Sequence, residues 1–390
     1  MIYRIERLND SKPIISSRTF AQAGIPEEAA SINGPSVAAV PGWVPEDRRA
    51  DPRARYYLYF AHHGGSYIRM AWAESLTGPY HLYRPRRPGS RGVLALAEID
   101  GRPLLRFENG VEVSSHIASP NVHVDETNRR FVLYFHGSTN TSTPPPHHMT
   151  GPQKTLVATS ATGLNFNLPE HGGEPGHGLR PALLGNAYFC VFAFRDYVYA
   201  FSNGGELWRA PRDRAWLPAD PPTADSWERG PNPVADALAQ ADASASFEVR
   251  STDPRHFAVR FVEPDRLEVF FSLRGDIEES IERIEIDLGG GEWSTWRATD
   301  YARLLSPQEP WEGALLPREI SRGGGQIRVR QLRDPAVFAD SDGSSYLFYC
   351  GAGEEGIGVA ALQRLSRDQP RAISKAGKTR ALERDIRSDR

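Results

Sequence analysis

Polar side chains recur where short apolar segments of this chain begin. Some of them can transfer a proton, and the others can donate or accept several hydrogen bonds. The set comprises Asn33, His116, Ser119, Tyr188, Arg255, His256, Arg333 and Asp334. If the segments that follow converge, these residues form a polar ring of mixed charge. We expect such a ring to bind a polyhydroxylated ligand.

Acid–base chemistry has three candidates. Asp334 is the carboxylate among these positions and the first choice for a general base. His256 and Glu354 are candidates for the acid, because histidine titrates near neutrality and Glu354 follows a strand of the same unit as Asp334. Asp276, just after another apolar segment, is a further candidate for binding a substrate.

Each candidate also has a structural interpretation. An aspartate before proline often caps a turn through its own backbone, which would account for Asp334. His116 and His256 could be satisfied inside the fold, and Glu354 could pair with Arg333. The residue types alone leave both interpretations open.

A transition-metal site is not expected. The cysteines number 2, Cys190 and Cys350, and both lie in apolar segments, as buried free thiols would. The adjacent histidines His62 and His63 would point to opposite faces of a strand. We therefore expect no cofactor, and leave room for a calcium or other ion in a central channel.

The apolar segments group into units of strand, turn and strand, followed by a third strand. The last unit shows the pattern most clearly, because 340–343 (Asp-Ser-Asp-Gly) supplies turn chemistry between two apolar runs. About five such units follow one another at a spacing of roughly 65–85 residues. This predicts an all-β fold, a five-bladed β-propeller, with a large β-sandwich as the rival. The segments are 35–40, 55–60 and 66–73; 119–124, 130–135 and 154–160; 187–192, 197–201 and 205–209; 256–261, 267–271 and 281–286; and 333–338, 345–349 and 356–362.

The units use nearly the whole chain, which predicts a single domain over 1–365. The charged segment 366–390 is predicted to be a disordered tail. The proline-rich segment 141–152 is either a lid or a variable surface loop, and 85–109 is predicted to be a long connection. A net charge of −3 gives no reason to expect nucleic acid or a membrane as partner. The chain shows no signal peptide and no long apolar run, so we expect a cytoplasmic protein.

Several of these segments resemble known propeller enzymes. The resemblance rests on 75–80 (Ser-Leu-Thr-Gly-Pro-Tyr), 116–122 (His-Ile-Ala-Ser-Pro-Asn-Val), 134–137, 333–338 (Arg-Asp-Pro-Ala-Val-Phe) and 346–354. These segments are similar to blades of five-bladed propeller glycoside hydrolases of the arabinanase and β-xylosidase group, family 43. The resemblance implies a five-bladed fold and the hydrolysis or binding of glycosides.

The chain departs from that family at the residues that matter most. Family members use an aspartate base on the first blade, a second aspartate on the second and a glutamate acid on the third. The corresponding positions here read 33–35 (Asn-Gly-Pro), 118–120 (Ala-Ser-Pro) and 185–187 (Gly-Asn-Ala). None is a carboxylate, so the family's residues are not carried over.

Three functions follow from these observations. The first is a glycosidase, or a related glycan phosphorylase, that cleaves a small or trimmed glycan by general acid–base catalysis. Inversion would need acid and base roughly 6.5–9.5 Å apart, and retention about 5–5.5 Å. The second is a sugar-binding propeller without catalysis, and the third is a scaffold for a protein partner. For the first two we expect His116, His256, Arg333 and Asp334 to converge on one pocket.

Overall fold

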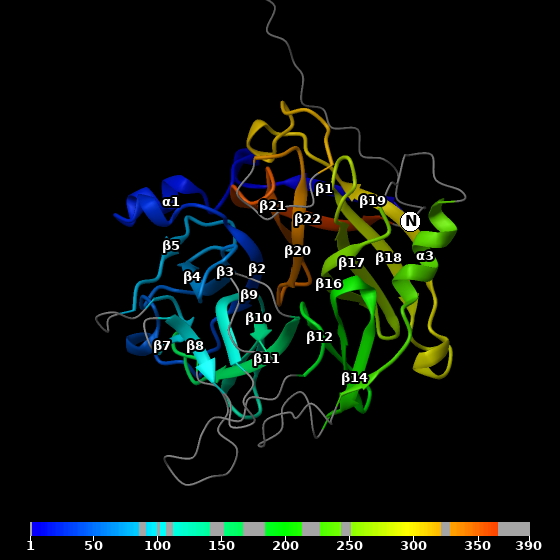
Figure 1. Cartoon of the computed structure of the whole chain (residues 1–390), viewed down its shortest axis with the longest axis horizontal. Coiled ribbons are helices and arrows are strands. Elements are labelled where there is room, and N and C mark those ends of the chain that lie inside the picture. Colours follow the sequence, from blue (N-terminus) through cyan, green and yellow to red (C-terminus); the bar gives the residue numbers. More distant parts are fainter. Residues whose placement is uncertain are drawn as a thin grey trace, which may run out of the picture.

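The chain folds into five antiparallel sheets arranged around a central axis, and each sheet follows the last in sequence order (Figure 1). This computed structural model describes residues 2–85, 91–99, 102–106, 112–140, 152–166, 184–212, 227–242, 251–320 and 328–365. The predicted five-bladed β-propeller is confirmed, and the β-sandwich is wrong. The predicted tail, 366–390, and most of the proline-rich segment 141–152 lie outside the described residues.

The innermost strand comes first along the chain in blades 1, 3 and 4, whereas two other strands precede it in blade 2 and the N-terminal strand precedes it in blade 5. Blade 1 contains β2 (Asn33–Ala39), β3 (Tyr56–Ala61), β4 (Tyr67–Ala73), β5 (His81–Leu82) and β6 (Leu94–Ala95). Blade 2 contains β7 (Ala97–Ile99), β8 (Arg102–Arg106), β9 (Glu112–Asp125), β10 (Arg130–Asn140) and β11 (Gln153–Ser160). Blade 3 contains β12 (Cys190–Phe194), β13 (Tyr197–Phe201), β14 (Leu207–Pro211) and β15 (Glu228–Arg229). Blade 4 contains β16 (Pro254–Glu263), β17 (Arg266–Leu273), β18 (Ile281–Asp287) and β19 (Ala298–Leu305). Blade 5 contains β20 (Leu332–Ala339), β21 (Ser345–Gly351), β22 (Gly356–Leu365) and β1 (Ile2–Arg7).

The core is divided among the contacts between neighbouring blades. Alternate residues of β3 show why, because side chains of a strand point to opposite faces. Tyr57 and Tyr59 pack with Phe131 of blade 2, whereas Leu58 and Phe60 pack with residues of blade 5. Both faces of the strand are therefore buried, and the strand is apolar throughout instead of alternating. Clusters of buried apolar side chains likewise lie between the other neighbouring blades.

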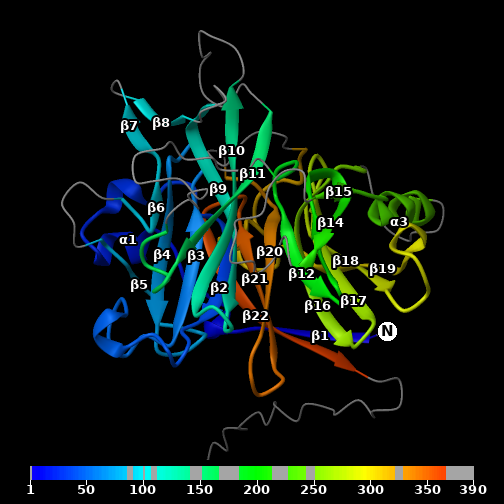
Figure 2. The same ribbon diagram turned by 90° about the horizontal axis from the view of Figure 1, so that it is seen from below.

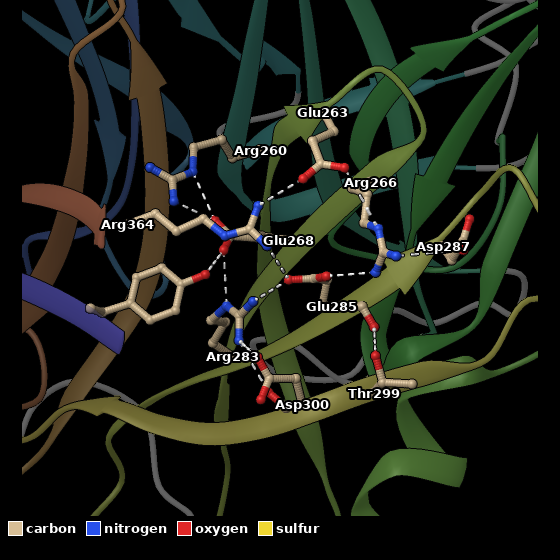
Figure 3. A network of polar contacts seen from close by, with 11 residues as sticks. Arg260, Glu263, Arg266, Glu268, Arg283, Glu285, Asp287, Thr299, Asp300 and Arg364 are labelled. Atoms are coloured by element: carbon tan, nitrogen blue, oxygen red, sulfur yellow. Dashed lines mark hydrogen bonds and ion pairs between the residues drawn. The ribbon is translucent and has the colours of Figure 1, made fainter. Parts of the chain in front are cut away.

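The N-terminal strand closes the ring. β1 pairs antiparallel with β22, from Ile2 opposite Leu365 to Arg7 opposite Ala360, and so becomes the outer strand of the last blade. A network of buried charges reinforces this closure (Figure 3). Glu268 of β17 is fully buried and accepts hydrogen bonds from Tyr3 of β1, from Arg260 and from Arg283. This network ties β1 to blade 4 as well as to blade 5.

One hairpin was not predicted. The segment 85–109, expected to be a connection, contains β6, β7 and β8. β7 and β8 form the hairpin. β8 pairs with the first residues of β9, Leu104 opposite Ser114, so the hairpin lies at the same end of the ring as the start of β9. Figure 2 shows β7 and β8 beside the projecting ends of β9 and β10.

In the described part of the chain, helices are few and lie outside the blades (Figure 1). The α-helices are α1 (Ser17–Gln22) and α3 (Pro233–Asp242), and the short 3-10 helices are η1 (Asn9–Ser11), η2 (Pro26–Glu28), η3 (Glu46–Arg48), η4 (Asn203–Gly205), η6 (Trp293–Thr295) and η7 (Pro310–Glu312). Among the described residues, no helix combines the length and the apolar character needed to cross a bilayer. Cys190 and Cys350 are buried free thiols, as predicted.

Candidate active site at the channel mouth

Each blade has a residue in the left-handed backbone conformation within its inner strand or just before it. The φ angles are 59° at Gly34, 49° at Ser119, 68° at Tyr188, 51° at His256 and 52° at Asp334. In blades 1, 2, 4 and 5 the register of the first two strands shifts at this residue, as in a β-bulge. A non-glycine residue rarely adopts this conformation, and such residues cluster at functional sites. We call these five the mouth residues, and they are therefore candidates for catalysis or ligand binding.

The mouth residues surround a cavity on the propeller axis. Its volume is about 190 Å³, and its walls are 34–37, 119–123, 188–191, 256–259 and 334–337. Every blade thus contributes one segment, which begins with its mouth residue. Gly34 has no room for a side chain here, because an added Cβ would lie 3.2 Å from the Cα of Ser119. The blades approach one another closely enough for side chains from three of them to touch.

Three mouth residues from three blades are in contact. His256 Nδ1 forms an ion pair with Asp334 Oδ1, and His256 Nε2 lies 3.3 Å from Ser119 Oγ. The other carboxylate oxygen of Asp334 accepts a hydrogen bond of 3.0 Å from the backbone N–H of Gly34. Asp334 is buried, whereas Ser119 and His256 are partly exposed. The arrangement holds the imidazole in one orientation and places its Nε2 beside Ser119, which also lines the cavity.

The environment of Asp334 keeps its carboxylate ionised. Burial alone would raise its pKa, but the charge of His256 and the hydrogen bond from it, followed by Arg255 and the Gly34 N–H, outweigh burial and lower the pKa below its ordinary value. A carboxylate with a lowered pKa is a weak base. Asp334 is therefore suited to orienting His256 and to stabilising its protonated form.

A buried ion cluster fixes the strands that carry this pair. Glu279 is fully buried and accepts two hydrogen bonds from Arg255, of 3.0 and 2.9 Å, and one of 3.1 Å from Arg333. Arg255 precedes His256 and Arg333 precedes Asp334 in the chain, so one carboxylate anchors both. Burial opposes ionisation of Glu279, but the two arginines outweigh it and lower its pKa.

An arc of rings continues around the mouth from His256. Ring centroids are 4.4 Å apart between His256 and Tyr188, 4.5 Å between Tyr188 and His136, 5.3 Å between His136 and His116, and 5.9 Å between His116 and His63. Burial lowers the pKa of His116 to about 4 and that of His136 well below its ordinary value. Both are neutral near pH 7. Within the described part of the chain, His116 Nδ1 and both ring nitrogens of His136 lack a hydrogen-bond partner.

These neutral histidines predict a loss of stability in weak acid. Between pH 6.5 and 4 the unfolded chain protonates His116 but the native protein does not, so the free energy of unfolding falls as the pH falls through this window. For one such histidine the loss is on the order of 3 kcal/mol. Urea unfolding at pH 7.5, 6 and 5 measures it. His116→Gln should flatten the decline, whereas His81→Gln, at an exposed position, should not. Equal slopes in all three proteins would contradict the prediction.

The predicted site residues lie in the cavity wall, beside the mouth residues, or elsewhere in the fold. Ser119, Tyr188, His256 and Asp334 line the cavity. His116 belongs to the arc of rings, and Asn33, Arg255 and Arg333 are buried immediately beside the mouth residues. Of the four residues expected to converge on one pocket, His256 and Asp334 line it, and His116 and Arg333 do not.

Two predicted residues lie elsewhere. Asp276 is fully buried and forms an ion pair of 2.7 Å with Arg303, away from the cavity wall. Glu354 accepts hydrogen bonds of 2.7 Å from Ser31 and 2.8 Å from Asn33, and it lies 3.6 Å from Arg333. The interpretation of Glu354 as a partner of Arg333 therefore agrees with the geometry. Its role as a catalytic acid, and that of Asp276 in binding, stay predictions.

Sequence reasoning missed His136, His63 and Gly34 as members of the site. A signal for the mouth residues was present, because each is followed three positions later by valine. These are Val37, Val122, Val191, Val259 and Val337. Aligning the five valines would have placed Gly34, Ser119, Tyr188, His256 and Asp334 in one ring. No comparable repeat marks His63, which follows β3, or His136, which lies within β10.

Comparison with known proteins agrees with this fold. No protein-family model matches the chain. An uncharacterized protein of Acanthamoeba polyphaga mimivirus is 28% identical over 340 residues, which are 86% of this chain and 84% of that protein. A glycosyl hydrolase from Bacteroides ovatus superposes with a TM-score of 0.51 and 12% identity, over 93% of this chain and 94% of that chain.

A second solved structure comes from a family of mannoside phosphorylases containing glycoside hydrolases that target β-1,2 mannosidic linkages in Candida mannan. It has a TM-score of 0.51 and 11% identity, and the match covers 93% of this chain and 94% of that chain. At such identities the likeness concerns the fold. The chain therefore has the five-bladed fold of propeller glycoside hydrolases, as its sequence resemblance implied.

Proposed function

We propose that the channel mouth binds a carbohydrate and hydrolyses a glycosidic bond, with His256 transferring the proton. The observation that carries this proposal is the orientation of His256, whose Nδ1 is held by Asp334 while Nε2 lies beside Ser119, another residue of the cavity wall. The fold supports a carbohydrate as substrate, because proteins of this fold include glycoside hydrolases.

The roles differ from those expected from sequence. Asp334 was the predicted base, but its two oxygens face His256 and the Gly34 N–H. We assign it the orientation of His256 instead. Protonated His256 donates to the glycosidic oxygen as the bond to the sugar carbon breaks, and the imidazole then takes a proton from the water that adds to that carbon. Asp334 stabilises the imidazolium in between.

The ring of Tyr188, which contacts His256 and lines the cavity, would hold the sugar. The faces of aromatic rings pack against the apolar faces of sugars, and the tyrosine hydroxyl can bond a sugar hydroxyl group. His136 and His116 follow Tyr188 in the arc of rings and would position it. A calcium or other ion in the channel stays a prediction.

A sugar-binding propeller without catalysis is the second candidate. One observation favours it: among the residues of the cavity wall, Asp334 is the sole carboxylate. Most glycoside hydrolases use two carboxyl groups flanking the scissile bond. In this alternative the ion pair of His256 and Asp334 would serve recognition alone.

Screening aryl glycosides and small oligosaccharides, with mannosides included, tests the proposal. For any substrate that is cleaved, we expect His256→Gln to lower turnover by on the order of 10²–10⁴-fold, the usual contribution of a general acid or base. His81→Gln, exposed on blade 1, is the matched control. Unchanged turnover in His256→Gln would refute the assignment. Sugar binding by calorimetry without turnover of any glycoside would support the binding propeller instead.

A further inference from the structure

We propose that Ser119, His256 and Asp334 form a nucleophilic triad, and that the channel mouth hydrolyses carboxylic esters through an acyl-serine intermediate. The substrate class is an ester of a small acid, in keeping with the cavity of about 190 Å³. This activity goes beyond glycoside cleavage and does not depend on it.

The contacts match what such a triad requires. A serine nucleophile needs a base within hydrogen-bond reach, and the base needs a third group that fixes its tautomer. Ser119 Oγ lies 3.3 Å from His256 Nε2, and His256 Nδ1 meets Asp334 Oδ1. The 3.0 Å hydrogen bond from the Gly34 N–H holds the remaining oxygen of Asp334. With its hydrogen on Nδ1, the imidazole presents a lone pair to the serine.

Backbone conformation and burial agree with this assignment. Ser119 has a φ of 49°, so its side chain leaves a β-bulge in a direction that a regular strand would not allow. The serine and the histidine are partly exposed, and the aspartate that orients them is buried. A buried cluster around Glu279 fixes the strands of His256 and Asp334 from behind. The three side chains come from blades 2, 4 and 5, so only the closed ring brings them together.

Ester hydrolysis by this triad needs no co-reactant other than water. Ser119 Oγ attacks the carbonyl carbon while its proton passes to His256 Nε2. The tetrahedral intermediate collapses, the bond to the alcohol oxygen breaks, and the alcohol leaves with the proton from His256. Water then attacks the acyl-serine and gives a proton to His256, which returns it to Ser119 as the acid departs.

Tyr188 is the donor that we assign to the carbonyl oxygen. Its ring contacts that of His256, and both residues line the cavity. Burial raises the pKa of its phenol, so the hydroxyl keeps its proton at neutral pH and can donate it. Loss of one such donor costs about 10²–10³-fold in turnover, which is the expected effect of Tyr188→Phe on ester hydrolysis.

A fluorophosphonate probe tests the nucleophile directly, because it labels serines activated by a neighbouring base. Peptide mapping by mass spectrometry should find the adduct on Ser119. Labelling should be absent in Ser119→Ala and strongly reduced in His256→Gln. Ser36→Ala changes another serine of the same cavity, and should leave labelling unchanged. Absence of any adduct in the native protein, or an adduct on another serine, would overturn the proposal.

A cysteine variant tests whether His256 acts as a base, and this test needs no substrate. Ser119→Cys places a thiol beside His256, and the native thiols are inert because burial raises the pKa of Cys190 to about 12 and that of Cys350 well above its ordinary value. If His256 acts as a base, iodoacetamide should alkylate the introduced thiol well below pH 8.5, the ordinary range of a cysteine thiol. Adding His256→Gln should move the reaction back to that range. Identical pH profiles in the two proteins would refute the triad.

Ser119→Ala also separates this proposal from glycoside cleavage. The substitution should abolish hydrolysis of p-nitrophenyl acetate. Because His256 and Asp334 remain, it should weaken glycoside turnover or sugar binding by no more than about tenfold, the contribution of one hydrogen bond to the sugar. If no glycoside is cleaved or bound while Ser119 is still labelled, the glycosidase proposal fails and the triad stands. If glycosides are cleaved but Ser119 is neither labelled nor needed for ester hydrolysis, the triad fails and the glycosidase stands.

Discussion

Replacing Asp334 by asparagine should lower turnover of any substrate of the channel mouth by on the order of 10²–10⁴-fold while the protein stays folded. The asparagine amide can donate to His256 Nδ1, which would move the imidazole hydrogen to Nε2. Nε2 could then no longer accept the Ser119 proton, and no negative charge would stabilise the imidazolium. Both the glycosidase and the triad proposals need that charge, so this variant tests both at once.

The measurement is kcat for native protein and Asp334→Asn across pH 5–9, with circular dichroism to confirm folding. Asp342→Asn is the matched control, because Asp342 lies in blade 5 on the exposed turn between β20 and β21. We expect the control to behave as the native protein. Activity of Asp334→Asn within about tenfold of native would exclude Asp334 from both mechanisms.

The second large effect concerns stability. Glu268→Gln removes the carboxylate at the centre of the network in Figure 3, so that buried Arg260 loses its carboxylate partner while Arg283 keeps Glu285 and Asp300. Removing one member of a buried ion pair typically costs about 3–5 kcal/mol, because the remaining charge is desolvated and uncompensated. We therefore expect a markedly lower urea midpoint for this variant.

Glu263→Gln provides the comparison within the same network. Glu263 pairs with Arg364 at 3.7 Å and with Arg266 at 3.8 Å, but its side chain is 56% exposed. An exposed ion pair contributes little, so this variant should unfold close to native protein. Equal midpoints for the two variants would show that the buried charges do not stabilise the ring as proposed.

The blades were predictable because their strands carry a local signal. Segments such as Tyr56–Ala61 and Ser345–Gly351 are apolar on both faces, since each blade packs between two others. Turn residues separate the segments, so the order of blades followed from the order of units. β8, in contrast, contains Pro103 and begins and ends with arginine, and no alternation marks it as a strand.

The site was only partly predictable, because its geometry depends on contacts between distant segments. The types of Ser119, His256 and Asp334 marked them as candidates, but the left-handed conformation that turns them toward one another is a property of the assembled ring. Asp276 and Glu354 were reasonable candidates by position. Their engagement with Arg303, and with Ser31 and Asn33, could be known only from the packed structure.

Closure of the ring by β1 has a consequence for biosynthesis. Ile2 leaves the ribosome long before its partner Leu365 is synthesised. Until then the first strand has no partner and blade 5 has an open edge, which is a hazard for association with other chains. The contact of Asp334 with Gly34 also joins the last blade to the first. We therefore expect nascent or prematurely terminated chains to be inactive and to need protection from aggregation, and activity to arise only with the complete ring.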